Sequence, residues 1–486
     1  MNPWWQNGSC DPFHDKDSPC LKGNEPIFTI EATSAQDIQA GLKFANEKNI
    51  RITVHNTGHD FLGRSSGASS LSISMSKING TGFNPSYSSS HYSGPVIKVG
   101  AGLRGYEVYG YANSLGYRVV GGDCPTVGLA GGYIQGGGHG SLVSMYGMAA
   151  DQVLEWEVVL PDGTMLTATP DQHSDLYWAL AGGGGGTFGV VLSVTIRAYQ
   201  DVGLISGARL TINNSSSIPS SVFWSMIGNY HAALPTLYSS GGGSVEHDIG
   251  ANQLFGISRI TAPKWTTQQL RQWLSPITRQ LDSYNASYSL NVTSHSSFHD
   301  HYVYYQGPIP AGRYGVAILA HSRLVPLDVV TSATKNSALT QFFRNSTEDS
   351  STSNVIYGCV GMDASAKGPV AANAILPAWR TSAMSCIMFI PFPYTASNNS
   401  VKQSDLHTLM DVVAPKLRAI TPNSGTYANE GNFALNTWKE DYYGKNWDRL
   451  SLVKKQVDPN GLLYGIRNVG SEKWTLHDDG RLCKKR

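Results

Sequence analysis

The sequence predicts an α+β fold in which a central α/β part, an antiparallel sheet flanked by helices, lies between an N-terminal and a C-terminal part of different character. Three observations predict it. A strand-helix-strand pattern covers residues 27–55, a hairpin pattern covers residues 154–168, and strands alternate with amphipathic helices over residues 201–422. The 486 residues are enough for two or three domains with buried cores.

The N-terminal pattern contains a helix with a defined start. Residues 27–30 and 51–55 form the strands, and between them Ser34 and Asp37 have the spacing of a capping box. The buried face of this helix consists of apolar residues at i, i+4 and i+7, which are Ile38, Leu42 and Ala45. A strand at residues 96–99 and a helix at residues 106–115 are expected to follow.

The hairpin is predicted from two apolar runs, residues 154–160 and 165–168, on either side of a Pro-Asp-Gly turn. A short helix at residues 174–180 and an apolar strand at residues 190–196 come next. The intervening segment 119–151 is too rich in glycine for regular structure throughout.

The middle of the chain has a different character. The strands expected there are residues 208–212, 254–260, 288–292, 355–360 and 386–390. The helices are residues 220–233, 266–281, 328–343 and 404–417, and Gln269 completes a capping box in the second of them. A last helix is expected at residues 447–457. We divide the chain into an N-terminal part of residues 1–200, with a core at about 24–198, a middle part of residues 201–422 and a C-terminal segment of residues 423–486.

Charge and hydropathy exclude several classes of function. Lys and Arg total 36 and Asp and Glu total 35, so the net charge is +1, whereas a protein that binds nucleic acid normally has a basic excess. No apolar run approaches the roughly 20 residues that cross a bilayer. We therefore expect a small-molecule substrate, no nucleic-acid partner and no membrane span.

Cysteines and glycosylation sequons indicate the secretory pathway, although residues 1–10 contain no signal peptide. Cys10 and Cys20 flank a loop-like segment and could form a disulfide, whereas Cys386 lies in an apolar run and is expected to be a buried thiol. Asn-x-Ser/Thr sequons, which predict a glycoprotein, begin at Asn7, Asn79, Asn213, Asn214, Asn285, Asn291, Asn345 and Asn398.

Two segments carry the candidate chemistry. Residues 55–63 directly follow a strand, and successive backbone amides there could bind a pyrophosphate. Residues 121–140 are so rich in glycine that a large planar ligand could lie against the backbone. Cys124 in this second segment could be a nucleophile, a metal ligand or a covalent tether, but the absence of a Cys-x-x-Cys motif argues against a metal.

These segments resemble the berberine bridge enzyme-like flavoproteins of the vanillyl-alcohol oxidase superfamily, whose FAD-binding domain is of the p-cresol methylhydroxylase type. The resemblance is carried by Asn-Thr-Gly-His-Asp at residues 56–60, Gly-Asp-Cys-Pro-Thr-Val-Gly at 122–128, residues 146–153 and the glycines of 183–189. At the C-terminus it is carried by Tyr-Ala-Asn-Glu at 427–430 and by residues 447–462. The sequence is most similar to fungal members.

The resemblance implies a two-part FAD-binding domain with an inserted substrate domain, and FAD bound covalently through both His59 and Cys124. A neutral imidazole and a thiolate are suitable nucleophiles for these two bonds. The other residues implied in FAD binding are Asn56, Thr57, Gly58, Asp60, Val127, Gly128, Gly131, Gly132, Gly137, Gly138, His139, Gly189 and Val190. No metal site is expected.

The catalytic residues implied by the resemblance are Tyr427, Asn429 and Glu430. Oligosaccharide oxidases of the family carry a Tyr where this chain has Phe61 and another where it has Glu430, so a sugar substrate is disfavoured. A partly desolvated Glu430 could act as general base or acid. The aromatic residues 298–305 could line the substrate pocket, or they could be a strand that packs within its own sheet.

The function implied is that of a FAD-linked oxidase, which moves a hydride from a small secondary metabolite to FAD and then to O2. A carbohydrate oxidase, an isomerase or cyclase with FAD but no net redox change, and a non-catalytic binding protein on the same fold are the alternatives. We also expect a secreted monomer.

Overall fold

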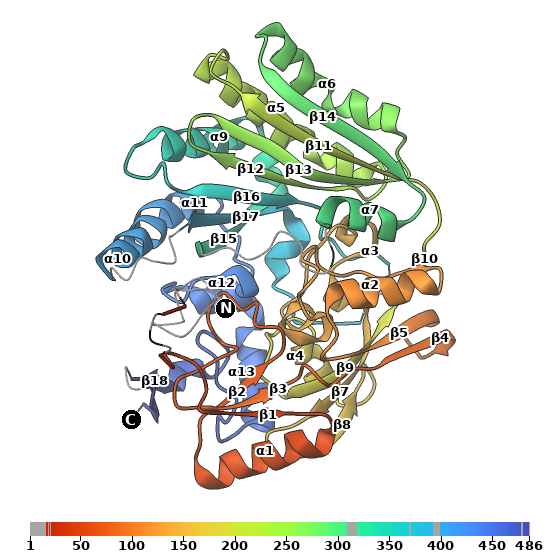
Figure 1. Ribbon diagram of the computed structural model, residues 1–486, viewed down its shortest axis with the longest axis vertical. Coiled ribbons are helices and arrows are strands. Elements are labelled where there is room, and N and C mark those ends of the chain that lie inside the picture. Colours follow the sequence, from red (N-terminus) through yellow and green to blue (C-terminus); the bar gives the residue numbers. More distant parts are fainter. Residues whose placement is uncertain are drawn as a thin grey trace.

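Two regions built on β-sheets lie one above the other in the computed structural model (Figure 1). The structure describes residues 16–17, 19, 21–307, 309, 318–368, 371–391, 399–477 and 480–485. Cys10, Cys20, Asn7 and Asn398 lie outside these residues, and so does the disulfide predicted between the first two.

The lower region in Figure 1 contains two sheets of three or more strands formed by the N-terminal part of the chain. A parallel sheet has the order β1-β3-β2, with β1 at Phe28–Glu31, β2 at Ile52–His55 and β3 at Leu71–Ser74. An antiparallel sheet has the order β4-β5-β9-β7-β8, with strands Thr81–Ser88, Ser93–Gly100, Val190–Arg197, Val153–Val159 and Met165–Ala168.

Helix α1 (Ala35–Lys48) connects β1 to β2, as predicted. The Ser34 side chain accepts a hydrogen bond from the Asp37 amide, and Ile38, Leu42 and Ala45 are fully buried. The remaining elements of this region are α2 (Gly105–Ser114), β6 (Tyr117–Arg118), α3 (Val143–Tyr146), α4 (Ser174–Leu180) and β10 (Tyr199–Gln200).

The upper region is a seven-stranded antiparallel sheet of order β14-β11-β13-β12-β16-β17-β15. In chain order β11 to β17 are Ile205–Asn214, Ser244–Gly250, Leu254–Pro263, Ser287–His295, Ile318–Pro326, Ile356–Gly361 and Ser382–Pro391. Helices α5 (Ser220–Ser239), α6 (Thr267–Ser283) and α9 (Ala333–Glu348) lie on the side of the sheet away from the lower region (Figure 1). The predicted antiparallel sheet flanked by helices is therefore confirmed.

Several details differ from the prediction. The helix expected at 328–343 is divided at Ser332 into α8 (Leu327–Thr331) and α9, and the one expected at 404–417 consists of α10 (Asn399–His407), a π-helical turn and α11 (Ala414–Ile420). Strands β12 and β15 were not predicted, because His, Glu, Asp and Arg interrupt their apolar alternation. The strand considered for residues 298–305 is wrong, since α7 (Phe298–Gln306) is a helix.

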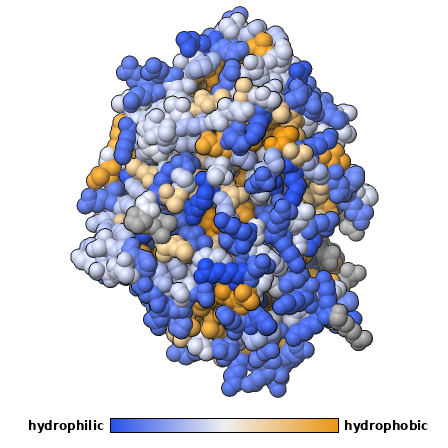
Figure 2. Space-filling model, turned by 180° about the vertical axis from the view of Figure 1, so that it is seen from behind, coloured by the Kyte–Doolittle hydropathy of each residue, from blue (hydrophilic) through white to orange (hydrophobic). Residues whose placement is uncertain are grey.

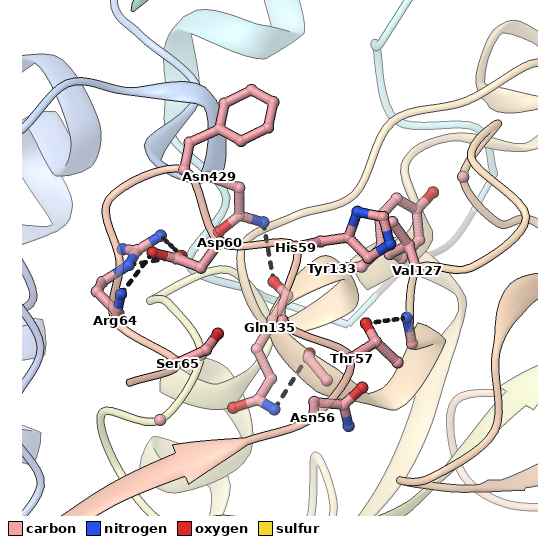
Figure 3. Close-up of a pocket in the computed structure, with 18 of the residues that line it drawn as sticks. Asn56, Thr57, His59, Asp60, Arg64, Ser65, Val127, Tyr133, Gln135 and Asn429 are labelled. Carbon is pink, nitrogen blue, oxygen red and sulfur yellow. Dashed lines mark hydrogen bonds and ion pairs between the residues drawn. The ribbon is translucent and has the colours of Figure 1, made fainter. Parts of the chain in front are cut away.

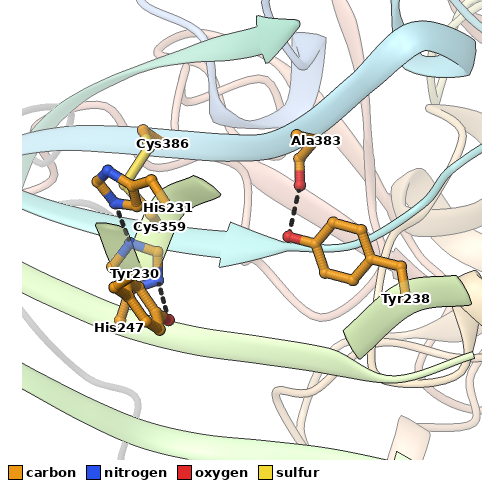
Figure 4. The surroundings of a disulfide bond; sticks show 7 residues. All are labelled: Tyr230, His231, Tyr238, His247, Cys359, Ala383 and Cys386. Carbon is orange, nitrogen blue, oxygen red and sulfur yellow. Dashed lines mark hydrogen bonds between the residues drawn. A yellow bond between two sulfur atoms is a disulfide. The ribbon is translucent and has the colours of Figure 1, made fainter. Parts of the chain in front are cut away.

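The expectation of a buried Cys386 thiol is also wrong. Cys359 in β16 and Cys386 in β17 are directly opposite each other in the sheet, and they form a disulfide (Figure 4). The sulfurs are surrounded by the buried residues Tyr230, His231 and His247, and His231 Nε2 lies 3.2 Å from His247 Nε2. Sequence spacing could not reveal this pair, because strand register brings the two cysteines together.

The C-terminal segment returns to the lower region. It contains α12 (Trp438–Tyr443), α13 (Trp447–Val457), β18 (Trp474–Leu476) and β19 (Leu482–Lys484). Leu463 forms a parallel bridge with Ile52 of β2, and the buried Lys454 ammonium donates to the Thr187 and Leu463 carbonyls and to Asp458. Both ends of the chain therefore share one hydrophobic core, while a second core lies between the seven-stranded sheet and its helices.

On the face seen in Figure 2, hydrophobic side chains form small patches separated by hydrophilic ones. Phe28, Val202 and Leu452 are among the large apolar residues that are exposed, and they lie in different parts of the chain. Within the described residues, every helix is too short or too polar to span a bilayer.

Candidate active site

A cavity of about 600 Å³ is lined by residues from both regions and from the C-terminal segment (Figure 3). The loop after β2 and the glycine-rich segment supply many of the lining residues. The seven-stranded sheet supplies Glu246, Ile318, Val360 and Ile387. The C-terminal segment supplies Tyr427, Asn429, Glu430, Leu463, Tyr464, Gly465 and Asn468.

The loop after β2 is held in shape by Asp60. Its carboxylate accepts hydrogen bonds from the amides of Leu62 (3.0 Å) and Arg64 (2.9 Å) and forms an ion pair with the Arg64 guanidinium. Gly58 has a φ of +79°, which favours glycine at this turn. Arg64 also donates to Asn468 Oδ1 (2.8 Å), so the ion pair connects the loop to the C-terminal segment.

His59 and Cys124 lie on two different loops, and the side chain of Thr126 lies between them. His59 Nε2 is 2.8 Å from Thr126 Oγ1, which is 3.6 Å from Cys124 Sγ. Burial lowers the pKa of His59 to about 4, so its imidazole is neutral at pH 7. Burial raises the pKa of the Cys124 thiol, although hydrogen bonds from the Thr126 side chain and from the Thr126 and Val127 backbone oppose this.

Asparagine side chains pack against the glycine-rich segment. A Cβ at Gly128 or Gly131 would lie within 3 Å of the Asn56 amide, and a Cβ at Gly136 would lie 2.3 Å from Asn429 Nδ2. Asn429 Nδ2 donates to the Gly132 carbonyl and to the Tyr427 hydroxyl, both at 2.8 Å. These glycines therefore allow two polar side chains to approach the backbone at the cavity wall.

His139 and Glu430 form the most direct acid-base pair in the cavity. His139 Nε2 is 2.8 Å from Glu430 Oε1, and the side chains are 12% and 15% exposed. Burial lowers the pKa of His139, but the Glu430 carboxylate outweighs it and the net pKa is raised. The His139 ring also contacts Tyr427 and Trp379, with centroid distances of 5.2 and 5.7 Å.

The structure brings most of the predicted site residues together around the cavity. Those that line it are Asn56, Thr57, Gly58, His59, Asp60, Cys124, Val127, Gly128, Gly131, Gly132, His139, Gly189, Tyr427, Asn429 and Glu430. Gly137, Gly138 and Val190 do not line it. Gly138 has a φ of +72° and lies against Tyr133 and Ala149, so its small size is required for packing.

Sequence reasoning missed an ionic cluster at the cavity wall. Arg259 Nη2 lies 2.7 Å from Asp123 Oδ1 and 2.8 Å from Glu246 Oε1, and Ser141 donates to Asp123 at 2.6 Å. Burial raises the pKa of Glu246 to about 7, against the effect of Arg259. Asp123 could have been noticed beside Cys124, but Glu246 and Arg259 reach it only through the register of β12 and β13.

The lining fits a large polar ligand such as FAD. Four buried atoms of lining residues have no hydrogen-bond partner among the described residues: Asn56 Oδ1, Gln135 Oε1, His139 Nδ1 and Glu430 Oε2. Buried polar atoms are normally paired, so these positions suit groups of a ligand. Gly132 and Gly186 also line the cavity and have open space where a Cβ would be.

Two family models match the chain, the FAD binding domain at residues 26–169 and the berberine and berberine-like domain at 426–468. A VAO-type flavoprotein oxidase of Thermothelomyces thermophilus is 41% identical over 480 residues, which are 99% of this chain and 82% of that protein. The bifunctional decalin synthase of Penicillium decumbens is 38% identical over 491 residues, covering 100% of this chain and 83% of that protein.

Solved structures agree with these relatives. A VAO-type flavoprotein of Myceliophthora thermophila C1 has a TM-score of 0.92 at 40% identity, covering 99% of this chain and 86% of that one. The glucooligosaccharide oxidase of Acremonium strictum, described with 6-S-cysteinyl, 8α-N1-histidyl FAD, has a TM-score of 0.72 at 17% identity, covering 97% and 96%. That likeness shows the fold alone. The chain belongs to the VAO-type, berberine bridge enzyme-like family of FAD-dependent oxidoreductases.

Proposed function

We propose that the protein is an oxidase that takes a hydride from a small organic secondary metabolite, with O2 as the final acceptor. FAD, when bound, supplies the hydride acceptor. The observation that carries the proposal is the His139–Glu430 pair, an acid-base pair in the wall of the cavity whose lining fits FAD. An oxidase needs such a group to remove the substrate's O–H or N–H proton.

Glu430 would be the general base, with Tyr427 and Asn429 beside it. Its Oε1 faces His139 Nε2, while Oε2 is buried without a partner among the described residues and could accept a substrate proton. Asn429 holds the Tyr427 hydroxyl at 2.8 Å, and that ring packs against His139. His139 would orient Glu430 through this contact.

Attachment of FAD through both His59 and Cys124 forms the second part of the proposal. The neutral imidazole of His59 can act as a nucleophile, and the two side chains share the Thr126 hydroxyl. The double linkage named for the Acremonium strictum enzyme, through a cysteine and ring nitrogen N1 (Nδ1) of a histidine, is a precedent on this fold. Amides of residues 57–60 would bind the pyrophosphate, residues 128–138 would border the ring, and Gly189 and Val190 would lie near the adenine.

In this proposal residues 1–200 and 423–486 hold FAD, and residues 201–422 contribute the substrate side of the cavity. Glu246, Val360 and Ile387 are the lining residues that suit this division. The Cys359–Cys386 disulfide and the sequons support a secreted, glycosylated protein, since disulfides persist in oxidising compartments. We propose that it acts as a monomer.

The decisive test is anaerobic mixing of the purified protein with a library of phenols, alcohols and amines from secondary metabolism. Bleaching of the flavin absorbance by a compound, followed by recovery and H2O2 production on admitting air, is the expected result. Turnover with the flavin still oxidised would contradict the oxidase and favour an isomerase or cyclase. The 38% identity to a decalin synthase is the observation that keeps this second function in view.

A carbohydrate oxidase is the less favoured alternative. Phe61 lines the cavity and Glu430 occupies the position of the sugar oxidases' tyrosine base, so both departures from the sugar-oxidising pattern lie in the site. Bleaching by oligosaccharides but not by the aromatic library would reverse this preference. A colourless purified protein would instead favour a binding protein.

A further inference from the structure

The hydroxyl of Thr126 connects the two side chains that we propose as FAD tethers. Oγ1 lies 2.8 Å from His59 Nε2 and 3.6 Å from Cys124 Sγ, and all three residues line the cavity. A hydroxyl has one hydrogen and can also accept. Thr126 can therefore donate to one of these partners while it accepts from the other.

Two orders of donation are possible, and they have opposite chemical consequences. If His59 Nε2 donates to Thr126 and Thr126 donates to the sulfur, then His59 Nδ1 keeps a free lone pair and the sulfur is stabilised as a thiolate. If the thiol donates to Thr126 and Thr126 donates to Nε2, then the ring proton occupies Nδ1, both ring nitrogens are engaged and the sulfur remains protonated.

The proposed chemistry favours the first order. It alone leaves both side chains able to react, because attack needs a lone pair on the imidazole and a thiolate on the cysteine. At Cys124, burial raises the pKa, while the Thr126 side chain and the Thr126 and Val127 backbone oppose this effect and favour the thiolate.

We propose that Thr126 is a positioning residue for FAD attachment, which accepts from His59 Nε2 and donates to Cys124 Sγ, so that His59 Nδ1 and Cys124 Sγ are presented as the two nucleophiles. This inference rests on the proposed double attachment. Each attachment replaces one flavin C–H bond by a C–N or C–S bond. In each attachment, the hydrogen of the N–H or S–H group and the hydrogen of the flavin C–H group are lost together with two electrons. O2 takes up both and becomes H2O2, so O2 is the two-electron oxidant.

The test uses Thr126→Val, which keeps the side-chain shape but removes the hydroxyl, and Thr126→Ser, which restores it. Removing the Thr126 hydroxyl raises the pKa of Cys124 and lowers its thiolate fraction. Peptide mass analysis of the flavin-loaded protein, purified after short and long expression, gives the linked fraction of each side chain. After short expression, we expect the Cys124-linked fraction of Thr126→Val to fall about tenfold, and the His59-linked fraction to fall much less, because burial by itself keeps the His59 imidazole neutral.

Thr195→Val is the matched control, since Thr195 is a buried threonine of β9 outside the cavity lining. Both Thr126→Ser and Thr195→Val should resemble wild type. Cys124→Ala provides the absorbance spectrum of flavin linked through His59 alone, and the Thr126→Val protein should match it after short expression.

A pH series separates this role from a structural one. Thr126→Val and Thr126→Ser proteins purified free of linked flavin, then mixed with FAD in air, should both form the Cys124 bond, with the midpoint at a higher pH for Thr126→Val. Asp123, His59 and Tyr302 are the titratable groups that face Cys124, and they are the same in both variants. Wild-type fractions of both linkages in Thr126→Val, or equal losses of both, would overturn the proposal. Wild-type protein without either linkage would refute the double attachment itself.

Discussion

At the scale of single residues, burial and close pairing set the protonation states of the cavity. His59 is neutral, Glu430 is paired with His139, and Glu246 is held by Arg259 beside a second carboxylate. Each of these side chains comes from a different element, so its surroundings depend on neighbours distant in the sequence. Two predictions follow from two of the carboxyl groups.

Replacing Glu430 by Gln should remove the proposed base while preserving its size and one hydrogen-bonding oxygen. We expect the rate of anaerobic flavin bleaching by a substrate to fall by about 10²- to 10⁴-fold, with flavin content unchanged. Glu440→Gln, an exposed change in the same segment, is the control and should bleach at the wild-type rate. A bleaching rate within threefold of wild type in Glu430→Gln would assign the base elsewhere.

Glu246 should make stability depend on pH. Its pKa is about 7 in the folded protein and 4.5 is the ordinary value, so the folded state binds its proton more tightly. This stabilisation is complete below pH 4.5 and is lost as the pH rises through 7. In urea unfolding, the free energy of unfolding should decrease less between pH 5 and pH 8 for Glu246→Gln than for wild type. Glu47→Gln, on the exposed side of α1, should leave the decrease unchanged.

At the scale of elements, the C-terminal segment is anchored by helix α13. The buried Lys454 donates to Asp458, and Asp458 accepts from the amides of Leu462 and Leu463, both at 2.9 Å. Leu463 in turn bridges to Ile52 of β2 and lines the cavity. This arrangement turns the chain back toward the loop that carries His59.

Asp458→Ala should therefore destabilise the protein strongly. It leaves the buried Lys454 ammonium without its carboxylate and two amides without their acceptor, so we expect the free energy of unfolding to fall by about 3–5 kcal/mol. Thermal or urea unfolding measures this change. Asp448→Ala, an exposed change in the first turn of the same helix, should cost less than about 1 kcal/mol. A similar loss in both variants would contradict the anchoring role of Asp458.

At the scale of the whole molecule, the cavity joins three stretches of chain. Lining residues come from the N-terminal region, from the seven-stranded sheet and from the C-terminal segment. A ligand that binds all three stabilises the folded state by mass action, because the unfolded chain does not form the cavity.

Removal of the flavin should consequently lower the melting temperature. The double variant His59→Ala with Cys124→Ala, dialysed free of flavin, should melt several degrees below Cys124→Ala, and added FAD should restore part of the difference. Fluorescence-monitored melting with and without FAD measures both effects. If the flavin-free double variant and Cys124→Ala melted at the same temperature, the three stretches of chain would be held together without the ligand.

Local sequence patterns were sufficient for most elements. The capping box of Ser34 and Asp37, the hairpin around its Pro-Asp-Gly turn and the amphipathic faces of α5 and α6 depend on residues close in the chain. Strands β12 and β15 escaped prediction because their polar residues point to a cavity or to buried partners. Glu246 faces the cavity wall, and Arg323 of β15 pairs with Asp441. Helix α7 was missed because aromatic residues cover it on several sides.

The sequence by itself determined the family motifs and the α+β class, and through the family resemblance it proposed His59, Cys124 and Glu430 as site residues, since each motif is a short run of neighbouring residues. Only the tertiary structure decided that Thr126 lies between His59 and Cys124, that His139 pairs with Glu430 and that Cys359 meets Cys386. These contacts join residues up to 291 positions apart. Packing and strand register fix them, and neither quantity is encoded in any local stretch of the chain.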